Sequence, residues 1–175
     1  MKTHKDCQIE KVTSRDAHRP ALGAPYFRGG ALWATDGRAM VKLPVESDET
    51  DAEGWVPLDA LKAARKLAGR LDTVSIHLNG AATLCNGAAF PRHDEKRREG
   101  TQWPNCERVF DDAMGKETKF SVAFDVRLLA AIADAMGTDQ VKLDLTDELT
   151  VIRVSPVGKA PSPDARGVLM PIRTA

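Results

Sequence analysis

The residue types that most often carry out chemistry are scattered along this chain. Cys7, Cys85 and Cys106 lie far apart, and the four histidines are equally dispersed. Metal sites and redox motifs use closely paired cysteines or histidines, and disulfide frameworks use an even number of cysteines. A glycine-rich phosphate loop is also missing from the sequence. We therefore expect a binding protein without a metal or cofactor, and not an enzyme. An active site assembled only by folding is the alternative.

A group of cations is the second chemical feature. Lys62, Arg65, Lys66 and Arg70 share one side of a predicted helix that carries no acidic residue there. Such a face can hold DNA phosphates without reading sequence. A face that is only solvated is the alternative. Because 25 Lys and Arg balance 25 Asp and Glu, net charge gives no general attraction to nucleic acid, and any DNA contact must come from a local face.

The helix that positions these cations begins after Val56. Pro57 suits the first helical position and Asp59 suits the first turn, and the helix should extend to about Ala68. Apolar and polar residues then alternate from Thr73 to Leu78, which predicts a half-buried strand.

A similar segment follows 67 positions later, the spacing that separates Leu61 from Leu128. A predicted strand over 120–124 leads to Asp125, a good N-cap, and then to a helix that ends at Met136 before Gly137. Residues 141–145 alternate like a strand. We interpret the two segments as a duplicated strand–helix–strands unit, with coincidence as the alternative.

The rest of the chain is predicted to form strands and loops. Residues 39–43 alternate as a strand after the turn at Thr35, Asp36 and Gly37. A further strand is predicted over 5–12, and no helix before Pro57. Loops are expected at 46–54, 92–101 and 155–167. The sequence thus predicts an α+β fold with largely antiparallel strands.

Size and composition limit the class of protein. We expect a single domain over 1–175, with N-terminal strands over 1–50 and repeat units over 55–110 and 118–175. Apolar residues make up 42% of the chain. No apolar run approaches the roughly 18 residues of a membrane span, and the polar N-terminus has no signal-peptide core. A cytoplasmic protein is therefore expected.

Three short motifs resemble one family, the beta subunit of bacterial DNA polymerase III, known as the sliding clamp. Ala34 to Met40 looks like the clamp's Thr-Asp-Gly turn, Trp103 to Phe110 resembles its Phe-Pro segment, and Gly167 to Arg173 is similar to its Met-Pro tail. The resemblance covers Tyr26 to Arg173. It implies a shortened, DNA-clamp-like domain in which the two repeat units are related by a pseudo-twofold axis, plus an N-terminal β-hairpin region.

The resemblance also implies a pocket for short partner peptides, because the three motifs line that pocket in the family. The matching positions, with one addition before them, are Phe27, Thr35, Gly37, Arg38, Met40, Pro104, Val109, Val168, Met170, Pro171 and Ile172. Met and branched aliphatic side chains suit a floor that receives a Leu or Phe anchor. The alternative is that the apolar residues among them are core residues at strand spacing.

The function implied is that of a clamp-like accessory factor of DNA replication or repair. It would bind a polymerase or other partner through a short peptide and could also hold duplex DNA. One domain cannot encircle a duplex, so a ring would need several copies of the chain. A monomeric adaptor or decoy that binds clamp partners without encircling DNA is the alternative. An enzyme or unrelated binding module on a similar fold is a third hypothesis.

Overall fold

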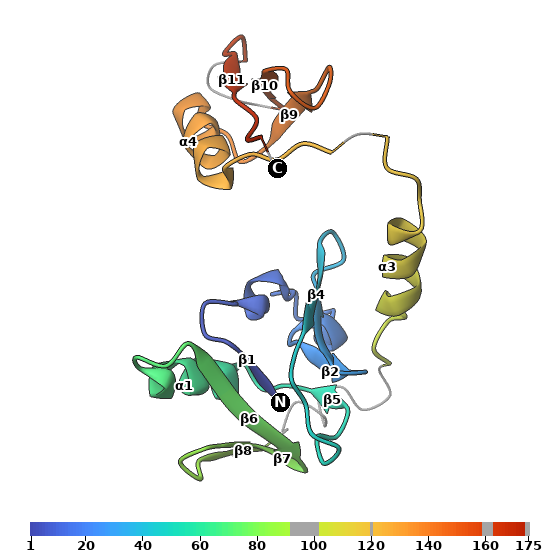
Figure 1. The fold of residues 1–175 in the computed structure, drawn as a ribbon, viewed down its shortest axis with the longest axis vertical. Coiled ribbons are helices and arrows are strands. Elements are labelled where there is room, and N and C mark those ends of the chain that lie inside the picture. Colours follow the sequence, from blue (N-terminus) through green and yellow to red (C-terminus); the bar gives the residue numbers. More distant parts are fainter. Residues whose placement is uncertain (92–101, 120, 159–162, 174–175) are drawn as a thin grey trace. The chain divides into compact units, whose positions relative to one another are not determined.

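The structure, a computed structural model, describes residues 1–91, 102–119, 121–158 and 163–173. The chain forms two compact units, unit 1 from Met1 to Gly115 and unit 2 from Lys116 to Ala175 (Figure 1). Their boundary falls between the predicted repeat units 55–110 and 118–175. The joining of both units into one domain, and a pseudo-twofold axis between the repeats, remain predictions.

Unit 1 contains two antiparallel sheets of four strands each, with the orders β1–β6–β7–β8 and β4–β3–β2–β5. The first comprises β1 (Lys2–His4), β6 (Thr73–Asn79), β7 (Ala81–Leu84) and β8 (Ala89–Pro91). The second comprises β2 (Tyr26–Arg28), β3 (Ala31–Thr35), β4 (Met40–Pro44) and β5 (Gly54–Trp55). The predicted strands over 39–43 and 73–78 are confirmed as β4 and β6.

Strand β3 is buried along its whole length. Leu32 and Ala34 belong to the main core of unit 1, whereas Ala31 and Trp33 pack with Cys106 on the other face. A strand that is covered on both faces has no polar positions to alternate with its apolar ones, so its sequence shows no period of two.

Helix α1 (Leu58–Ala68) packs on the β1–β6–β7–β8 sheet. Its buried stripe consists of Ala60, Leu61, Ala64 and Ala68, and burial of the Leu61 side chain contributes about 2 kcal/mol. The helix boundaries agree with the prediction. Leu67 and Leu71, which share the apolar arc of that helix in the sequence, are 45% and 67% exposed and lie outside the core.

The prediction for the N-terminal region is wrong. Instead of a strand over 5–12, the short strand β1 leads to a single 3-10 turn, η1 (Ile9–Val12), and a second turn, η2 (Pro20–Leu22), follows. Ile9 is buried and Val12 packs against the same core. Two apolar residues three positions apart lie on one side of a 3-10 turn, whereas a strand would place them on opposite faces.

Helix α3 (Cys106–Met114) is absent from the prediction. The Asn105 side chain caps it by accepting a hydrogen bond from the Arg108 N–H at 3.1 Å. Cys106 is buried, and Phe110 meets Trp33 edge to face with ring centroids 5.7 Å apart. Cys106, Val109, Phe110, Ala113 and Met114 recur at the spacing of an amphipathic helix, so the sequence carries a helical signal here that the prediction missed.

Unit 2 is a helix on a sheet. Helix α4 (Val126–Met136) packs on β10 (Ile152–Pro156) and β11 (Gly167–Leu169), and β9 (Val141–Asp144) completes the order β11–β10–β9. The caps are as predicted, with the Asp125 carboxylate accepting from the Arg127 N–H and Gly137 left-handed at φ 67°.

Two details of unit 2 differ from the prediction. Where a strand is predicted over 120–124, Ala123 forms only an isolated bridge with Ile172, and residue 120 lies outside the described residues. Strand β10 continues to Pro156, so the loop predicted from residue 155 begins later. Pro156 is tolerated at this last position because the strand ends there, so the N–H group that proline lacks removes little hydrogen bonding from the sheet. The loop predicted over 92–101 also lies outside the described residues.

Candidate functional site: an apolar pocket beside the Thr35–Ala39 turn

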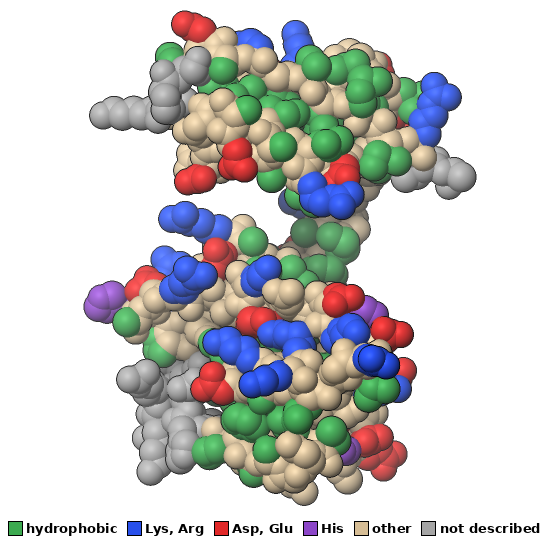
Figure 2. Space-filling view, turned by 90° about the vertical axis from the view of Figure 1, so that its left-hand side faces the viewer, with side chains coloured by type: hydrophobic (Ala, Val, Ile, Leu, Met, Phe, Trp, Pro, Cys, Tyr) green, Lys and Arg blue, Asp and Glu red, His purple; other side chains and the backbone are tan. Residues whose placement is uncertain are grey.

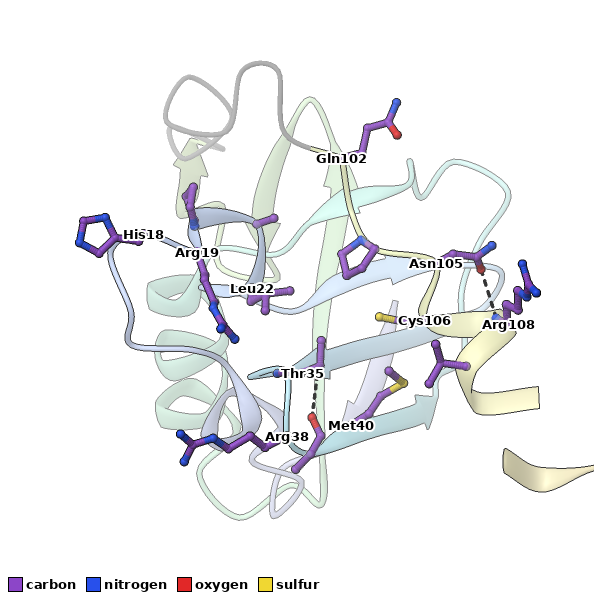
Figure 3. A pocket seen from close by; sticks show the side chains of 16 residues that line it. His18, Arg19, Leu22, Thr35, Arg38, Met40, Gln102, Asn105, Cys106 and Arg108 are labelled. Carbon is purple, nitrogen blue, oxygen red and sulfur yellow. Dashed lines mark hydrogen bonds between the residues drawn. The ribbon is translucent and has the colours of Figure 1, made fainter. Parts of the chain in front are cut away.

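An open pocket of about 980 Å³ lies in unit 1 (Figure 3). Three segments that are distant in sequence surround it: residues 18–22 at η2, residues 35–40 between β3 and β4, and residues 102–109 at the start of α3. The apolar side chains that line it include Met40, Leu22, Pro104, Cys106 and Val109. We call this hollow the apolar pocket.

The turn that forms one wall is held by hydrogen bonds between its side chains and the backbone groups of residues 35–39. The Thr35 hydroxyl donates to the Ala39 carbonyl at 2.7 Å and accepts from the Gly37 N–H at 3.0 Å. The Asp36 carboxylate accepts from the Arg38 and Ala39 N–H groups, each at 2.8 Å, and the pKa of that carboxyl is lowered by these bonds, with the Ala39 bond first. These bonds fix the turn.

Gly37 is required by this turn. Its φ is +90°, and a Cβ at this position would lie 2.8 Å from Nη1 of Arg19. The absence of a side chain therefore lets the Arg19 guanidinium lie against the turn.

The opposite wall is the beginning of α3. The Cys106 N–H donates to the Pro104 carbonyl at 2.7 Å, which holds the proline beside the first helical turn. Burial, and then the charge of Glu107, raise the pKa of the Cys106 thiol, so it stays protonated and acts as an apolar wall atom. Val109 is 60% exposed, a side chain open to a ligand.

Six of the sequence-predicted peptide-binding residues line this single pocket: Thr35, Gly37, Arg38, Met40, Pro104 and Val109. Phe27 is not among the lining residues; it is 3% exposed and belongs to the core of unit 1. Its part in peptide binding stays a prediction.

The remaining predicted residues, Val168, Met170, Pro171 and Ile172, belong to unit 2. Val168, Met170 and Ile172 are 66%, 65% and 52% exposed. The alternative that the apolar residues of the motifs are core residues is therefore wrong for these three and for Val109. Their part in peptide binding stays a prediction.

Several lining residues were not predicted from sequence. They are His18, Arg19, Pro20, Ala21 and Leu22 before β2, and Gln102, Asn105, Cys106 and Arg108 beside α3. Residues 18–22 carry no periodic pattern and form only a 3-10 turn. The Asn105 cap, followed by apolar residues at helical spacing from Cys106 to Met114, is the local signal that could have indicated the α3 wall.

The predicted cationic face of α1 is partly neutralised. Arg65 forms a two-pronged ion pair with Glu10 of η1, and these side chains are 18% and 13% exposed. Lys62, Lys66 and Arg70 are exposed, and Lys and Arg side chains gather on the face of unit 1 that carries α1 (Figure 2). Arg65 therefore anchors η1 to α1, and three of the four cations face solvent.

Other kinds of site are not found in the part of the chain that the structure describes. Within it, no three His, Cys, Asp or Glu side chains are grouped so that they could hold a metal ion. Among the same residues, no helix is long and apolar enough to cross a membrane.

Comparison with known proteins identifies the fold. No protein-family model and no curated protein matches the chain significantly. Among solved structures, the C. crescentus beta sliding clamp matches 99% of the chain with 15% identity and a TM-score of 0.50. The DnaN sliding clamp of Pseudomonas aeruginosa bound to griselimycin covers 99% at 17% identity with a TM-score of 0.38. The Thermotoga maritima DNA polymerase III beta subunit covers 100% at 13% identity with a TM-score of 0.34. The chain spans 65% of the length of each of these proteins. The α+β chain thus has the fold of a shortened bacterial DNA sliding clamp.

Proposed function

We propose that the protein is a clamp-like accessory factor of DNA replication or repair that binds short peptide motifs of a polymerase or another partner. The observation that carries the proposal is the apolar pocket. Residues selected from two distant motifs, Thr35 and Met40 from one and Pro104 and Val109 from the other, line this one hollow of unit 1.

The chemistry of the pocket suits a peptide anchor. Met40 and Leu22 provide adaptable apolar surface, and Pro104 gives a rigid rim. The volume of about 980 Å³ is within the range of pockets that enclose small ligands, so it can hold one or two large apolar side chains. Catalysis would need a group positioned to move a proton or attack a substrate. In this pocket the Cys106 thiol is kept neutral by burial, and the Thr35 hydroxyl donates its proton to the Ala39 carbonyl.

Calorimetric titration of the protein with a synthetic peptide that carries adjacent Leu and Phe anchors tests the proposal. Met40→Ala and Val109→Ala should each weaken binding by about 1–3 kcal/mol, since buried anchor contacts carry most of the affinity in small interfaces. Val41→Ala is a matched control, because Val41 follows Met40 in β4, is 37% exposed and does not line the pocket. Absence of any peptide binding by the parent protein would refute the proposal.

Duplex DNA is a second proposed ligand, and the exposed cations Lys62, Lys66 and Arg70 of the α1 face favour it. A ring around DNA would need several copies of the chain, whereas a monomeric decoy would need only the peptide pocket. Light scattering of the purified protein with and without duplex DNA separates these two forms of the proposal. A cytoplasmic location is part of either form.

A further inference from the structure

A second hollow, of about 430 Å³, shares Arg19 and Arg38 with the apolar pocket. We call it the polar hollow, because its other lining residues are Lys11, Thr13, Ser14, Arg15, Asp16 and Asp36. The two guanidinium groups that border both hollows make them parts of one continuous surface. A ligand seated in the apolar pocket therefore continues past Arg19 and Arg38 into a polar environment.

The polar hollow carries an excess of positive charge. Lys11, Arg15, Arg19 and Arg38 face only two carboxylates, those of Asp16 and Asp36. Both carboxylates are already engaged as turn caps. Asp16 accepts from the His18 N–H at 2.9 Å, and its other oxygen lies 3.7 Å from Nε of Arg19.

Three of these cations have no close ion-pair partner among the described residues, although the charge of Arg38 also helps to lower the pKa of the Asp36 carboxyl. Within the described ranges 1–91, 102–119, 121–158 and 163–173, the side chains of Lys11, Arg15 and Arg38 form no ion pair, and all three are exposed. The apolar pocket adds Arg108 and has no acidic side chain among its lining residues. In a chain whose charges balance at 25 against 25, this local imbalance favours a ligand with negative charge.

We propose that the partner peptide carries acidic residues next to its apolar anchor, and that these Asp or Glu side chains lie in the polar hollow against Lys11, Arg15, Arg19 and Arg38. This inference rests on the proposed function and specifies the partner's chemistry. The anchor supplies buried apolar contact, and the acidic flank supplies long-range attraction and orientation along the surface.

A peptide fits this composite surface better than a nucleic acid. Nucleic-acid grooves that hold single strands stack bases on aromatic rings, and the described lining of the apolar pocket contains no Phe, Tyr or Trp. Its methionine, leucine, valine and prolines contact aliphatic or aromatic peptide side chains instead. The combination of an apolar pocket with an adjacent cationic hollow matches an acidic peptide that has a hydrophobic anchor.

Three synthetic peptides test the proposal: one Leu-Phe anchor with flanks of Glu, of Gln or of Lys. The parent protein should bind the Glu-flanked peptide on the order of tenfold more tightly than the Gln-flanked one at low salt. The Lys-flanked peptide should bind more weakly than both. The preference for Glu over Gln should shrink as salt is raised, because exposed charges are screened.

The variant Lys11→Glu/Arg15→Glu sharpens the test, because Lys11 and Arg15 line the polar hollow but not the apolar pocket. It should reduce affinity for the Glu-flanked peptide by roughly fivefold or more and leave the Gln-flanked peptide unaffected. The same charge change in Lys116→Glu/Lys119→Glu, at exposed positions outside both hollows, is the matched control and should alter neither affinity.

The outcomes separate this inference from the proposed function. Equal affinity for all three flanks overturns the inference and leaves the apolar pocket as the peptide site. No binding of any peptide overturns the proposed function. If the Lys11→Glu/Arg15→Glu variant keeps its preference for the Glu flank but loses affinity for duplex DNA, the polar hollow is a phosphate site and the inference is wrong.

Discussion

The carboxylate of Asp51 accepts a hydrogen bond from the ammonium group of Met1, and the side chains of both residues are 1% exposed. The same carboxylate accepts from the Leu78 N–H at 2.9 Å and from the Asp48 N–H at 3.1 Å, while the ammonium group also donates to the Ile76 carbonyl at 2.7 Å. A residue of an acidic loop thus ties the chain terminus to strand β6. In sequence, Asp51 is indistinguishable from its exposed neighbours.

Asp51→Asn should lower the free energy of unfolding by about 3 kcal/mol, because it leaves a buried ammonium group without its counter-charge. Urea unfolding measures the loss. Asp48→Asn removes the same charge from an exposed side chain of the same loop and should change the free energy by less than about 0.5 kcal/mol. Equal effects of the two substitutions would contradict a special role for Asp51.

The ion pair between Met1 and Asp51 predicts that the free energy of unfolding depends on pH. Burial pushes the pKa of Asp51 upward, but hydrogen bonds from the Met1 ammonium group and from the Leu78 and Asp48 N–H groups outweigh it, and the net pKa lies below 3.8. A lowered native pKa stabilises the fold above the unfolded value, and this stabilisation disappears as pH falls through the native pKa. The difference in unfolding free energy between the parent protein and Asp51→Asn should therefore be constant above about pH 5 and shrink below pH 4. Urea titrations at several pH values measure it, and a difference that grows toward acid would refute the linkage.

Truncation of Leu169, the last residue of β11, and truncation of its sequence neighbour Met170 should affect stability differently. Leu169 is 2% exposed in the core of unit 2, so Leu169→Ala should cost about 2–5 kcal/mol of stability. Met170 is 65% exposed, and Met170→Ala should change stability by less than about 0.5 kcal/mol. Thermal melts followed by circular dichroism compare the two. A large loss for Met170→Ala would mean that this side chain is core and unavailable to a peptide.

Gly37→Ala should damage the peptide site through the turn. It adds left-handed backbone strain of roughly 1 kcal/mol and forces the Arg19 side chain to move, because the new Cβ would lie 2.8 Å from Nη1. Gly87→Ala is a matched control with φ +82° and nothing within 4 Å of the added Cβ. Peptide affinity should fall only for Gly37→Ala, while backbone strain lowers the melting temperature of both. Equal peptide affinity in the two variants would show that the turn does not shape the pocket.

Binding of duplex DNA by the α1 face should involve the three exposed cations and not Arg65. Lys62→Glu, Lys66→Glu and Arg70→Glu should each reduce the slope of log affinity against log salt by roughly one. Arg65→Glu should instead reduce stability, since it removes the cation that pairs with Glu10 and places a second negative charge there. Affinities measured at two salt concentrations decide between these outcomes. Negligible affinity of the parent protein at low salt would mean that the face is only solvated.

The elements that the sequence predicts correctly are those whose local signals agree. Helix α4 has an N-cap at Asp125, a continuous apolar stripe and a left-handed stop at Gly137, so its limits follow from neighbouring residues alone. Strand β6 alternates because only one of its faces is fully buried, whereas β4 has no fully buried residue and only Met40 and Leu43 are half-buried. Strand β3 escapes prediction because it is buried along its whole length, whereas α3 carries an apolar stripe at helical spacing that the prediction overlooked.

The candidate site is predictable only where it uses short motifs. The turn at Thr35 and Gly37 and the Pro104 segment resemble a known family, and both line the apolar pocket. Arg19 and Leu22 belong to a 3-10 turn and its N-cap, and residues 18–22 show no periodic pattern that would predict them in the pocket. Phe27, added to the predicted site from outside the three motifs, is buried in β2, and its part in peptide binding stays a prediction.

The aromatic cluster of unit 1 allows the unfolding of the two units to be distinguished by spectroscopy. Tyr26 stacks on Trp103 with ring centroids 5.1 Å apart and meets Trp55 edge to face at 5.2 Å, while Trp33 lies under Lys42. These are all the tryptophans and the one tyrosine of the sequence, and all lie within residues 1–115. Intrinsic fluorescence therefore reports on unit 1 alone, whereas the helical signal in the far ultraviolet includes α4. Coincident transitions in the two signals would mean that the units unfold as one cooperative body.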